Sequence, residues 1–162
     1  MKNSNVLQWK LILHSSFFTL HYNNMHTVYL GLGTNLGDGR RNIAVAVRLL
    51  GERVGTVVRT SSLYETEPWG FSSDNMFTNA AVCIETSLTP RGVLEATQAI
   101  EREMGRTRKS TDGQYHDRII DIDILTYDDL HIDEPGLVIP HPLMHERDFV
   151  MLPLNEILEH TV

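Results

Sequence analysis

The sequence predicts an α+β fold in which helices pack on one face of an antiparallel sheet. Three observations lead to this expectation. Four apolar, β-branched segments are typical of strands, and two further segments repeat apolar residues at helical spacing. Turn residues separate these segments, and no internal repeat or linker divides the chain. The resulting order of strand, helix, strand, strand, helix and strand is the split βαβ, or ferredoxin-like, arrangement.

Composition narrows the class of protein. Apolar residues make up 41% of the 162 residues and charged residues 22%, which is typical of one globular domain with a proper core. The formal charge of −7 argues against broad nucleic-acid binding, and no apolar stretch approaches the ~18 residues of a membrane helix. The single cysteine, Cys83, fits a reducing compartment. We therefore expect a cytoplasmic protein that binds small molecules, with no nucleic-acid or membrane partner. A monomer is compatible with these features, and the sequence leaves the oligomeric state open.

Residues 1–24 differ from the rest of the chain because they contain no acidic residue. His14, Ser15 and Ser16 interrupt their apolar run, and no small-residue cleavage site follows, so a signal peptide is not expected. Met25 stands just before the first strand. We expect a dispensable leader over residues 1–24 and a single domain over residues 25–162.

The first half of the chain begins with a buried strand over Thr27–Leu32. The glycine-rich stretch 33–39 has the spacing of neither nucleotide-binding fingerprint, so its glycines are interpreted as turn formers. Residues 55–66 predict one long strand, and residues 67–74 predict a loop from their Pro, Gly and Ser content. A helix that Gly51 is expected to end lies between the first two strands, with a buried stripe of Ile43, Ala46, Val47 and Leu50.

The next strand and helix follow over residues 76–105. In the strand Met76–Glu85, Phe77 and Asn79 share a face. Thr89 and Pro90 are expected to open the helix as N-cap and first residue, and Gly105 to end it. Its expected buried stripe is Val93, Leu94, Thr97, Ile100 and Met104. Gln98 and Glu101 are neighbours on one helical face, which in such pairs is usually solvated.

The segment Arg118–Leu125 is the strand around which the chemistry is organised. Side chains two apart in a strand point to the same side, so Asp121 and Asp123 lie together while the isoleucines line the other face. Two close carboxylates repel unless a cation lies between them, and carboxylate oxygens suit Mg²⁺. The structural alternative is an exposed polar face of a half-buried strand. Asp is depleted in strands, and Arg118 adds a partner for anions, so we favour a metal site.

The C-terminal part is expected to be irregular before a final short helix. Residues 128–135 are rich in turn residues, and prolines stiffen the connection Ile139–Pro142 around His141. A lone histidine in this setting is more often structural than functional. A helix is predicted over His145–Leu152, interrupted by Pro153.

Several of these segments, in this order, resemble the 6-hydroxymethyl-7,8-dihydropterin pyrophosphokinase family of folate biosynthesis. The resemblance runs from Met25 to about residue 160. It is carried by Tyr29–Asp38, Ser62–Gly70, Phe77–Ala81, Glu101 with Gly105–Arg108, Arg118–Asp123, Pro140-His141 and Arg147–Phe149. It implies Mg²⁺-dependent transfer of pyrophosphate from ATP to the hydroxymethyl group of a reduced pterin, with release of AMP.

The resemblance also implies roles for individual residues. Asp121 and Asp123 would hold two Mg²⁺ ions and, with Arg106 and Arg118, form the catalytic group. The nucleotide side would comprise Gln98, Glu101, Arg108, Tyr115, Ile124, His141 and Arg147. The pterin pocket would comprise Thr66, Pro68, Trp69, Phe77, Asn79 and Phe149, with the two phenylalanines on either face of the ring. The loops 67–76 and 106–117 match mobile loops of the family, and the second is expected to close over ATP.

The chain departs from the family pattern at a few positions. His116 and Asp117 precede Arg118, where the family usually has a small residue and often a proline. Tyr115 stands where tryptophan is frequent, Glu67 replaces a common proline, and Pro142 stands where an aromatic residue is common. These differences concern loop details and contacts with adenine.

Two other functions remain open from the residues alone. The chain could be a different Mg²⁺-dependent nucleotide enzyme on the same fold, or a ferredoxin-like regulatory module that binds a small ligand without chemistry. The paired aspartates and nearby arginines favour an enzyme.

Overall fold

The computed structural model describes residues 25–105 and 116–158, and its main sheet has the predicted ferredoxin-like order. The expected leader and most of the loop 106–117 lie outside the described residues. Strands β1 (His26–Thr34), β2 (Thr56–Thr60), β4 (Phe77–Thr86) and β5 (Asp121–Tyr127) pair antiparallel in the order β2-β4-β1-β5. In the described part of the chain, no helix is both long and apolar enough to cross a membrane. The α+β prediction is confirmed.

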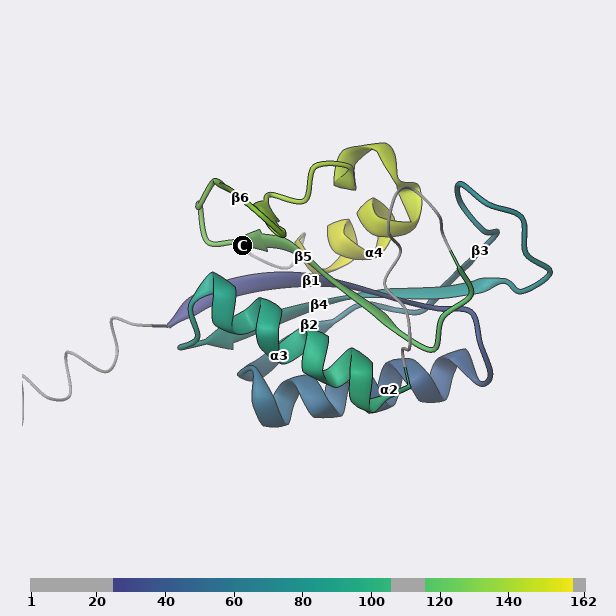
Figure 1. Ribbon diagram of the computed structural model, residues 1–162, viewed down its shortest axis with the longest axis horizontal. Helices are drawn as coiled ribbons and strands as arrows, with labels where there is room; N and C mark the ends of the chain where they lie inside the picture. Colours follow the sequence, from purple (N-terminus) through teal and green to yellow (C-terminus); the bar gives the residue numbers. More distant parts are fainter. Residues whose placement is uncertain (1–24, 106–115, 159–162) are drawn as a thin grey trace, which may run out of the picture.

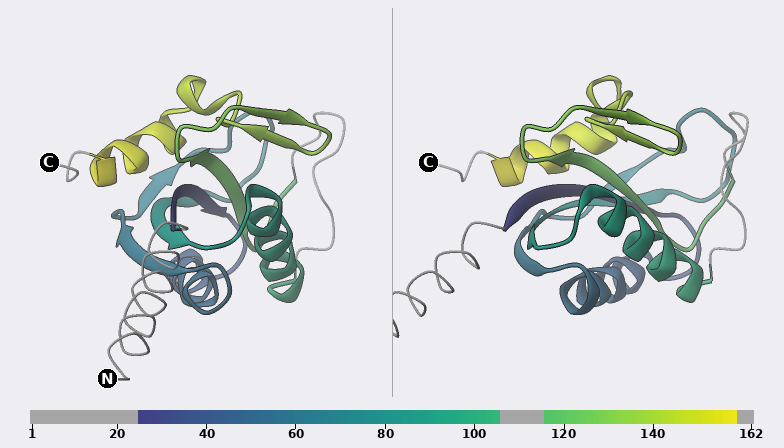
Figure 2. Two further views of the ribbon diagram at one scale, coloured as in Figure 1. Left: turned by 90° about the vertical axis from the view of Figure 1, so that its left-hand side faces the viewer. Right: turned by 60° about the vertical axis from the view of Figure 1, so that its left-hand side comes forward.

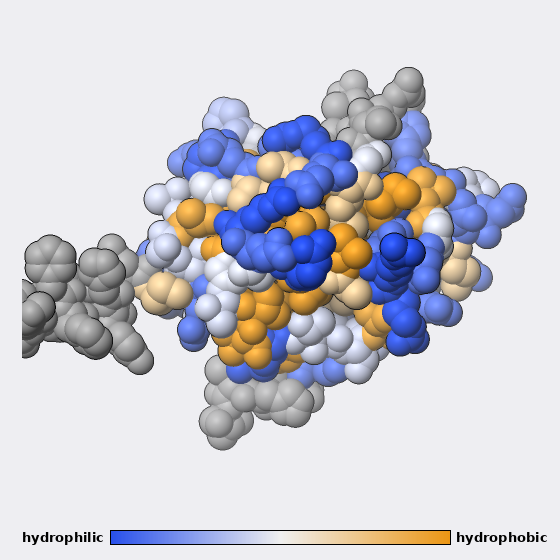
Figure 3. Space-filling view, turned by 90° about the horizontal axis from the view of Figure 1, so that it is seen from below, coloured by the Kyte–Doolittle hydropathy of each residue, from blue (hydrophilic) through white to orange (hydrophobic). Residues whose placement is uncertain are grey.

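Two helices, α2 (Gly39–Arg53) and α3 (Pro90–Glu103), cover one face of this sheet (Figure 1). Thr89 caps α3 as predicted, its side chain accepting from the Gly92 N–H at 3.1 Å. Gly51 does not end α2, which runs on to Arg53. A glycine inside a helix costs only about 1 kcal/mol relative to alanine, and burial of the preceding Leu49 and Leu50 outweighs this. Seen from this side, Figure 3 shows hydrophilic side chains over much of the outer surface of the helices.

A third helix, α4 (Asp148–Leu158), lies on the opposite face of the sheet (Figure 2), so the expectation that helices pack on one face holds for α2 and α3 but not for this C-terminal helix. A 3₁₀ turn, η1 (Met144–Glu146), precedes it. The helix also continues through Pro153, which was expected to interrupt it. A proline removes one backbone hydrogen bond, at a cost of ~3 kcal/mol, but its neighbours here gain burial against the second face. The second core consists of Tyr29, Ala81, Cys83, Leu125, Met144, Val150, Leu154 and Ile157.

The long strand expected over residues 55–66 is divided into β2 and β3 (Tyr64–Thr66) by a bulge. Thr60 pairs with Val82 and Tyr64 with Asn79, so four steps on one strand correspond to three on β4. Ser61 fills the break, because its hydroxyl accepts the Ala81 N–H at 2.9 Å while its own N–H donates to the Ala81 carbonyl. The β-branched composition of residues 55–66 did not reveal this interruption of the strand.

A small hairpin follows β5 where only turns were expected. Strands β6 (Ile132–Glu134) and β7 (Leu137–Ile139) pair antiparallel, and Gly136 takes a φ of 77° in the two-residue turn between them. Leu137 and Ile139 are buried, which explains why so short a hairpin is retained. The turn prediction for residues 128–135 therefore holds only in part.

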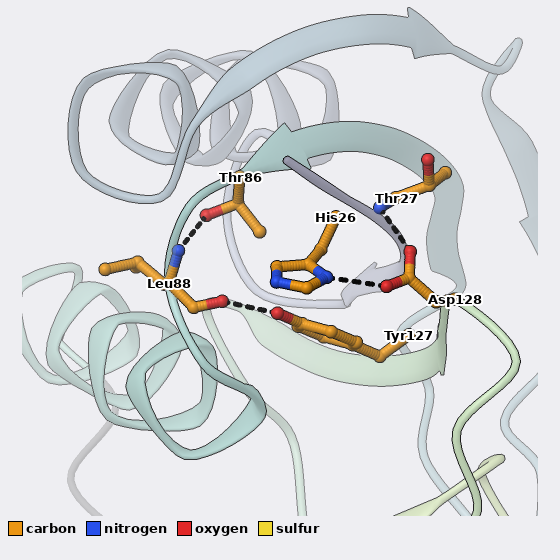
Figure 4. A network of polar contacts seen from close by, with 6 residues as sticks. All are labelled: His26, Thr27, Thr86, Leu88, Tyr127 and Asp128. Atoms are coloured by element: carbon orange, nitrogen blue, oxygen red, sulfur yellow. Dashed lines mark hydrogen bonds and ion pairs between the residues drawn. The ribbon is translucent and has the colours of Figure 1, made fainter. Parts of the chain in front are cut away.

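Polar contacts fasten the end of β1 and β5 that is farther from the aspartates (Figure 4). The Asp128 carboxylate accepts from the Thr27 N–H at 2.8 Å and lies 2.6 Å from Nδ1 of His26. The hydroxyl of Tyr127 donates to the Leu88 carbonyl at 2.6 Å, joining β5 to the segment before α3. These contacts fix the edge strand β5 at one end, and the candidate site lies toward the other.

Candidate active site

A pocket that is open to solvent lies between the sheet and the start of α4. Residues of β1, β3, β4 and β5, of the loop 67–76, of the segment before β5 and of the start of α4 meet there, although they are far apart in the sequence. Its lining includes Thr66, Trp69, Phe71, Phe77, Asn79, Arg118, Asp121, Asp123, Arg147 and Phe149. Aromatic rings therefore share one pocket with two guanidinium groups and, counting Glu67, three carboxylates.

The floor of the pocket contains glycines of β1. Gly33 pairs with Asn79 on one side and Asp121 on the other, and Gly31 pairs with Ala81 and Asp123. A Cβ on Gly33 would lie 3.2 Å from Oδ1 of Asn79. Gly33 is thus a strand residue whose lack of a side chain leaves room for a ligand, rather than the turn former expected from the sequence. Two glycines at alternate positions of one strand were the available signal.

The two aspartates project from one face of β5 into the pocket, as the sequence predicted. Both are partly buried, while Ile120, Ile122 and Ile124 are buried in the core on the other face. Arg118 donates from Nη1 to Oδ2 of Asp121 at 2.6 Å. The positive charge of the guanidinium thus reduces the repulsion between the two carboxylates, and the same group can bind an anionic ligand.

Glu101 of α3 supports the aspartate strand from behind. Its side chain is only 4% exposed, and Oε1 accepts from the N–H of Ile122 at 2.7 Å. The solvated face expected for Gln98 and Glu101 is therefore wrong for Glu101. A buried carboxylate bound to the backbone between the two aspartates fixes where both side chains emerge.

One side of the pocket is aromatic and carries a cation. The guanidinium carbon of Arg147 lies 4.5 Å from the ring centroid of Trp69 and 5.8 Å from that of Phe149. The two rings are 6.3 Å apart, and the arginine is only 8% exposed. Arg118 lies over Phe77 at 5.5 Å. Both arginines therefore rest against rings that could also hold a flat ligand.

Asn79 presents an oriented amide at the other side of the pocket. Its Nδ2 donates to Oγ1 of Thr66 at 2.9 Å, which fixes the amide and makes Oδ1 the group able to accept from a ligand N–H. Phe77 lies on the same face of β4, as the spacing predicted, and its ring meets that of Phe71 edge-on at 6.0 Å.

His141 is fixed next to the pocket without lining it. Its ring Nδ1 accepts from the Leu143 backbone N–H at 3.2 Å, and the backbone N–H of His141 donates to the Leu125 carbonyl at 2.9 Å. Burial, followed by the charge of Arg147, lowers the pKa of His141 below 6.5, although Asp121 acts in the opposite direction. The imidazole is therefore neutral near pH 7.

Of the fourteen predicted site residues that the structure describes, nine line the pocket and five, His141 among them, do not. Thr66, Trp69, Phe77, Asn79, Arg118, Asp121, Asp123, Arg147 and Phe149 line the pocket. Gln98, Pro68 and Glu101 are not in its lining, and the side chain of Ile124 lies in the core behind β5. Arg106, Arg108 and Tyr115 lie outside the described residues. Gly31 and Gly33 also line the pocket and were not predicted to belong to the site.

Sequence comparisons agree with the resemblance noted above. The model of the family 7,8-dihydro-6-hydroxymethylpterin-pyrophosphokinase (HPPK) matches residues 29–159. A Porphyromonas gingivalis relative, named 2-amino-4-hydroxy-6-hydroxymethyldihydropteridine pyrophosphokinase, is 50% identical over 134 residues, 82% of this chain and 91% of the relative. A Bacillus subtilis protein of the same name is 45% identical over 132 residues, 81% of this chain and 77% of its own length.

Solved structures share the fold. A crystal structure of an HPPK-DHPS in complex with substrates has a TM-score of 0.66 at 15% identity, over 84% of this chain and 40% of that one. The Plasmodium falciparum HPPK-DHPS with pterin and p-hydroxybenzoate has a TM-score of 0.64 at 20% identity, over 83% of this chain and 38% of that one. The chain thus spans about two fifths of these longer proteins, and the likeness is one of fold.

Proposed function

The chain belongs to the 7,8-dihydro-6-hydroxymethylpterin-pyrophosphokinase family of diphosphotransferases, and we propose that it transfers the pyrophosphoryl group of ATP to 6-hydroxymethyl-7,8-dihydropterin. The hydroxymethyl oxygen bonds to the β-phosphorus, the bond from that phosphorus to the α,β-bridging oxygen breaks, and AMP leaves. The alcohol proton is released. The reaction requires Mg²⁺ and serves folate synthesis. The meeting of Asp121 and Asp123 with an aromatic pocket is the observation that carries this proposal.

The donor set supports Mg²⁺ as the metal. Asp121 and Asp123 offer carboxylate oxygens from one strand face, and in residues 25–105 and 116–158 no cluster of three or more His, Cys, Asp or Glu is suited to a metal. Mg²⁺ is typically bound by one or two carboxylates together with substrate phosphates and water, so two aspartates are a suitable protein contribution. When bound, two ions would neutralise charge on the transferred phosphates.

Arg118 and Arg147 supply the remaining positive charge in the pocket. Phosphoryl-type transfer depends on positioning and charge stabilisation more than on covalent catalysis, so fixed guanidinium groups are suitable partners for the triphosphate. Arg118 is held by Asp121, and Arg147 by stacking on Trp69. We assign no general base, since a primary alcohol can lose its proton late in such a reaction.

The aromatic wall and the Asn79 amide support binding of the pterin ring. Phe77 and Phe149 offer flat apolar surfaces, and stacking on such a ring is worth ~1–3 kcal/mol. Asn79 Oδ1 can accept from a ring N–H, because Thr66 holds the amide nitrogen. This arrangement distinguishes a ring with polar edges from a purely apolar ligand.

The test is incubation of the protein with ATP, Mg²⁺ and 6-hydroxymethyl-7,8-dihydropterin, followed by assay of AMP and of the pyrophosphorylated pterin. We expect both products in equal amounts and neither without Mg²⁺. Release of ADP would indicate transfer of a single phosphoryl group by a different nucleotide enzyme. Binding of either ligand without turnover would support the regulatory module. A cytoplasmic location is part of the proposal and is compatible with the single, buried thiol of Cys83.

A further inference from the structure

The carboxylate of Asp117 joins three loops beside the pocket. Its Oδ1 accepts from Nδ2 of Asn35 and from the hydroxyl of Ser73, both at 2.7 Å, and its Oδ2 accepts from Nδ2 of Asn75 at 3.1 Å. The bond from Ser73, helped by the two asparagines and the charge of Arg118, lowers the pKa of Asp117. The group is therefore an ionised acceptor for all three donors at neutral pH.

One of the three attachments is rigid. Asn35 is only 6% exposed, and it is bound twice to Arg118. The Arg118 N–H donates to Oδ1 of Asn35 at 2.7 Å, and the Asn35 N–H donates to the Arg118 carbonyl at 3.1 Å. Asp117 is thus attached directly to the backbone that positions Arg118 beside Asp121.

The other two attachments belong to the loop 67–76, which joins β3 to β4. This loop carries Trp69 and Phe71 into the pocket lining, yet Trp69 is 41% exposed and Met76 is 52% exposed. Little apolar burial is available to offset the entropy of ordering such a loop. Ser73 accepts the Asn75 N–H at 3.1 Å, so both donors to Asp117 belong to one local turn.

We propose that Asp117 is a positioning residue whose carboxylate ties the loop 67–76 to Asn35 and so holds Trp69 and Phe71 in place as a wall of the pterin pocket. The inference rests on the proposed function, since it names the pterin as the ligand of that wall.

The tie acts on pterin affinity more than on the transfer step. Without the Asp117 carboxylate, the loop 67–76 must become ordered when the pterin ring binds. The apparent affinity for the pterin is then the intrinsic affinity multiplied by the fraction of molecules whose loop is already in the binding-competent state. Asp117→Ala removes hydrogen bonds to a charged group. From the usual strength of such bonds, we expect the pterin KM to rise about tenfold. We expect kcat and the KM for ATP to change by no more than about twofold, because Arg118 keeps both bonds to Asn35.

A second measurement reports the loop directly. The chain has two tryptophans, Trp9 and Trp69, so the full-length Trp9→Phe variant has a single tryptophan, on the loop, which can be excited selectively over the tyrosines. In that background Asp117→Ala should raise the acrylamide quenching constant of Trp69, and Ser73→Ala should raise it less. The double variant should match Asp117→Ala alone, because both changes remove one contact. Asp74→Ala, an exposed carboxylate of the same loop, is the matched control and should behave as wild type.

The outcomes separate this inference from the proposed function. If wild type makes no AMP with the pterin, the proposed function fails, and quenching still decides the role of Asp117. If wild type is active and Asp117→Ala keeps its pterin KM and its quenching constant, the positioning role is refuted. Additive effects of the Ser73 and Asp117 changes would also refute it. Should Asp117→Ala fold poorly, as judged by its melting temperature, Ser73→Ala decides between the two outcomes in the same assays.

Discussion

Replacing Glu101 with alanine removes the acceptor that holds the aspartate strand from behind. The carboxylate is buried and binds the Ile122 N–H at 2.7 Å, between Asp121 and Asp123. A buried donor left without its acceptor costs ~1–3 kcal/mol, so the free energy of unfolding of Glu101→Ala should fall by about that amount. Because the same bond sets the position of both aspartates, turnover should fall as well.

The assay is urea denaturation of wild type, Glu101→Ala and Glu101→Gln. Equal dependence of the free energy of unfolding on urea concentration would show that the three proteins expose the same surface when they unfold. Glutamine keeps an oxygen that can accept from Ile122, so it should retain most of the stability. Glu95→Ala, an exposed change on the same helix, is the control and should stay within about 0.5 kcal/mol of wild type. If Glu101→Ala were as stable as wild type, the bond would contribute nothing. If Glu101→Gln were as unstable as alanine, charge rather than the hydrogen bond would be responsible.

Three further predictions concern the pocket. Asp123→Asn should lower AMP release at saturating Mg²⁺ by roughly a thousandfold or more while the melting temperature stays close to wild type, and near-normal turnover would remove this carboxylate from the reaction. Phe149→Ala should weaken pterin binding by roughly five- to 150-fold and ATP binding less, and calorimetry giving the reverse order would place Phe149 on the nucleotide side. Because the pKa of His141 is lowered on folding, by burial and then by Arg147, the unfolded chain binds the proton more readily. The free energy of unfolding should therefore fall as pH drops below 6.5, until the folded-state pKa is passed, and His141→Gln should flatten this part of the profile measured without Mg²⁺.

The features that the sequence predicted correctly depend on short spacings. Asp121 and Asp123 are two apart on one strand, and so are Phe77 and Asn79, so the period of a strand places each pair on one face. Both pairs line the pocket. The cap at Thr89 is equally local, since its partner is three residues away. Such relations need no knowledge of the rest of the fold.

Features that depend on tertiary packing were missed. The apolar pattern of α4 indicates a buried face but not which side of the sheet covers it, and burial around Pro153 carried the helix beyond an apparent stop. The division at Ser61 arises from a side-chain contact with Ala81, twenty residues away. Propensity is a weak guide at such positions because tertiary contacts override it.

The hydrogen bonds of Asp117 show why part of the site could not be predicted from the sequence. Its donors Asn35, Ser73 and Asn75 are separated from it by 82, 44 and 42 residues. The sequence revealed only that Asp117 departs from the family pattern. Its partners could be identified only once the three loops were placed next to one another.

The pairing of the strands also explains how one pocket can serve two different groups of a ligand. Across the sheet, Asn79, Gly33 and Asp121 stand in one row, and Ala81, Gly31 and Asp123 in the next. Adjacent strands are about 4.8 Å apart, so the amide and the first carboxylate are separated by roughly 10 Å over a floor without side chains. A one-residue slip of β5 would turn both aspartates into the core and the isoleucines into the pocket. The backbone bond from Glu101 and the bond from Arg118 to Asp121 hold β5 at this end, and the Asp128 contacts hold the other. Register, rather than any single side chain, is therefore what keeps the predicted ring-binding amide and the phosphate-binding carboxylates at a distance that one ligand can span.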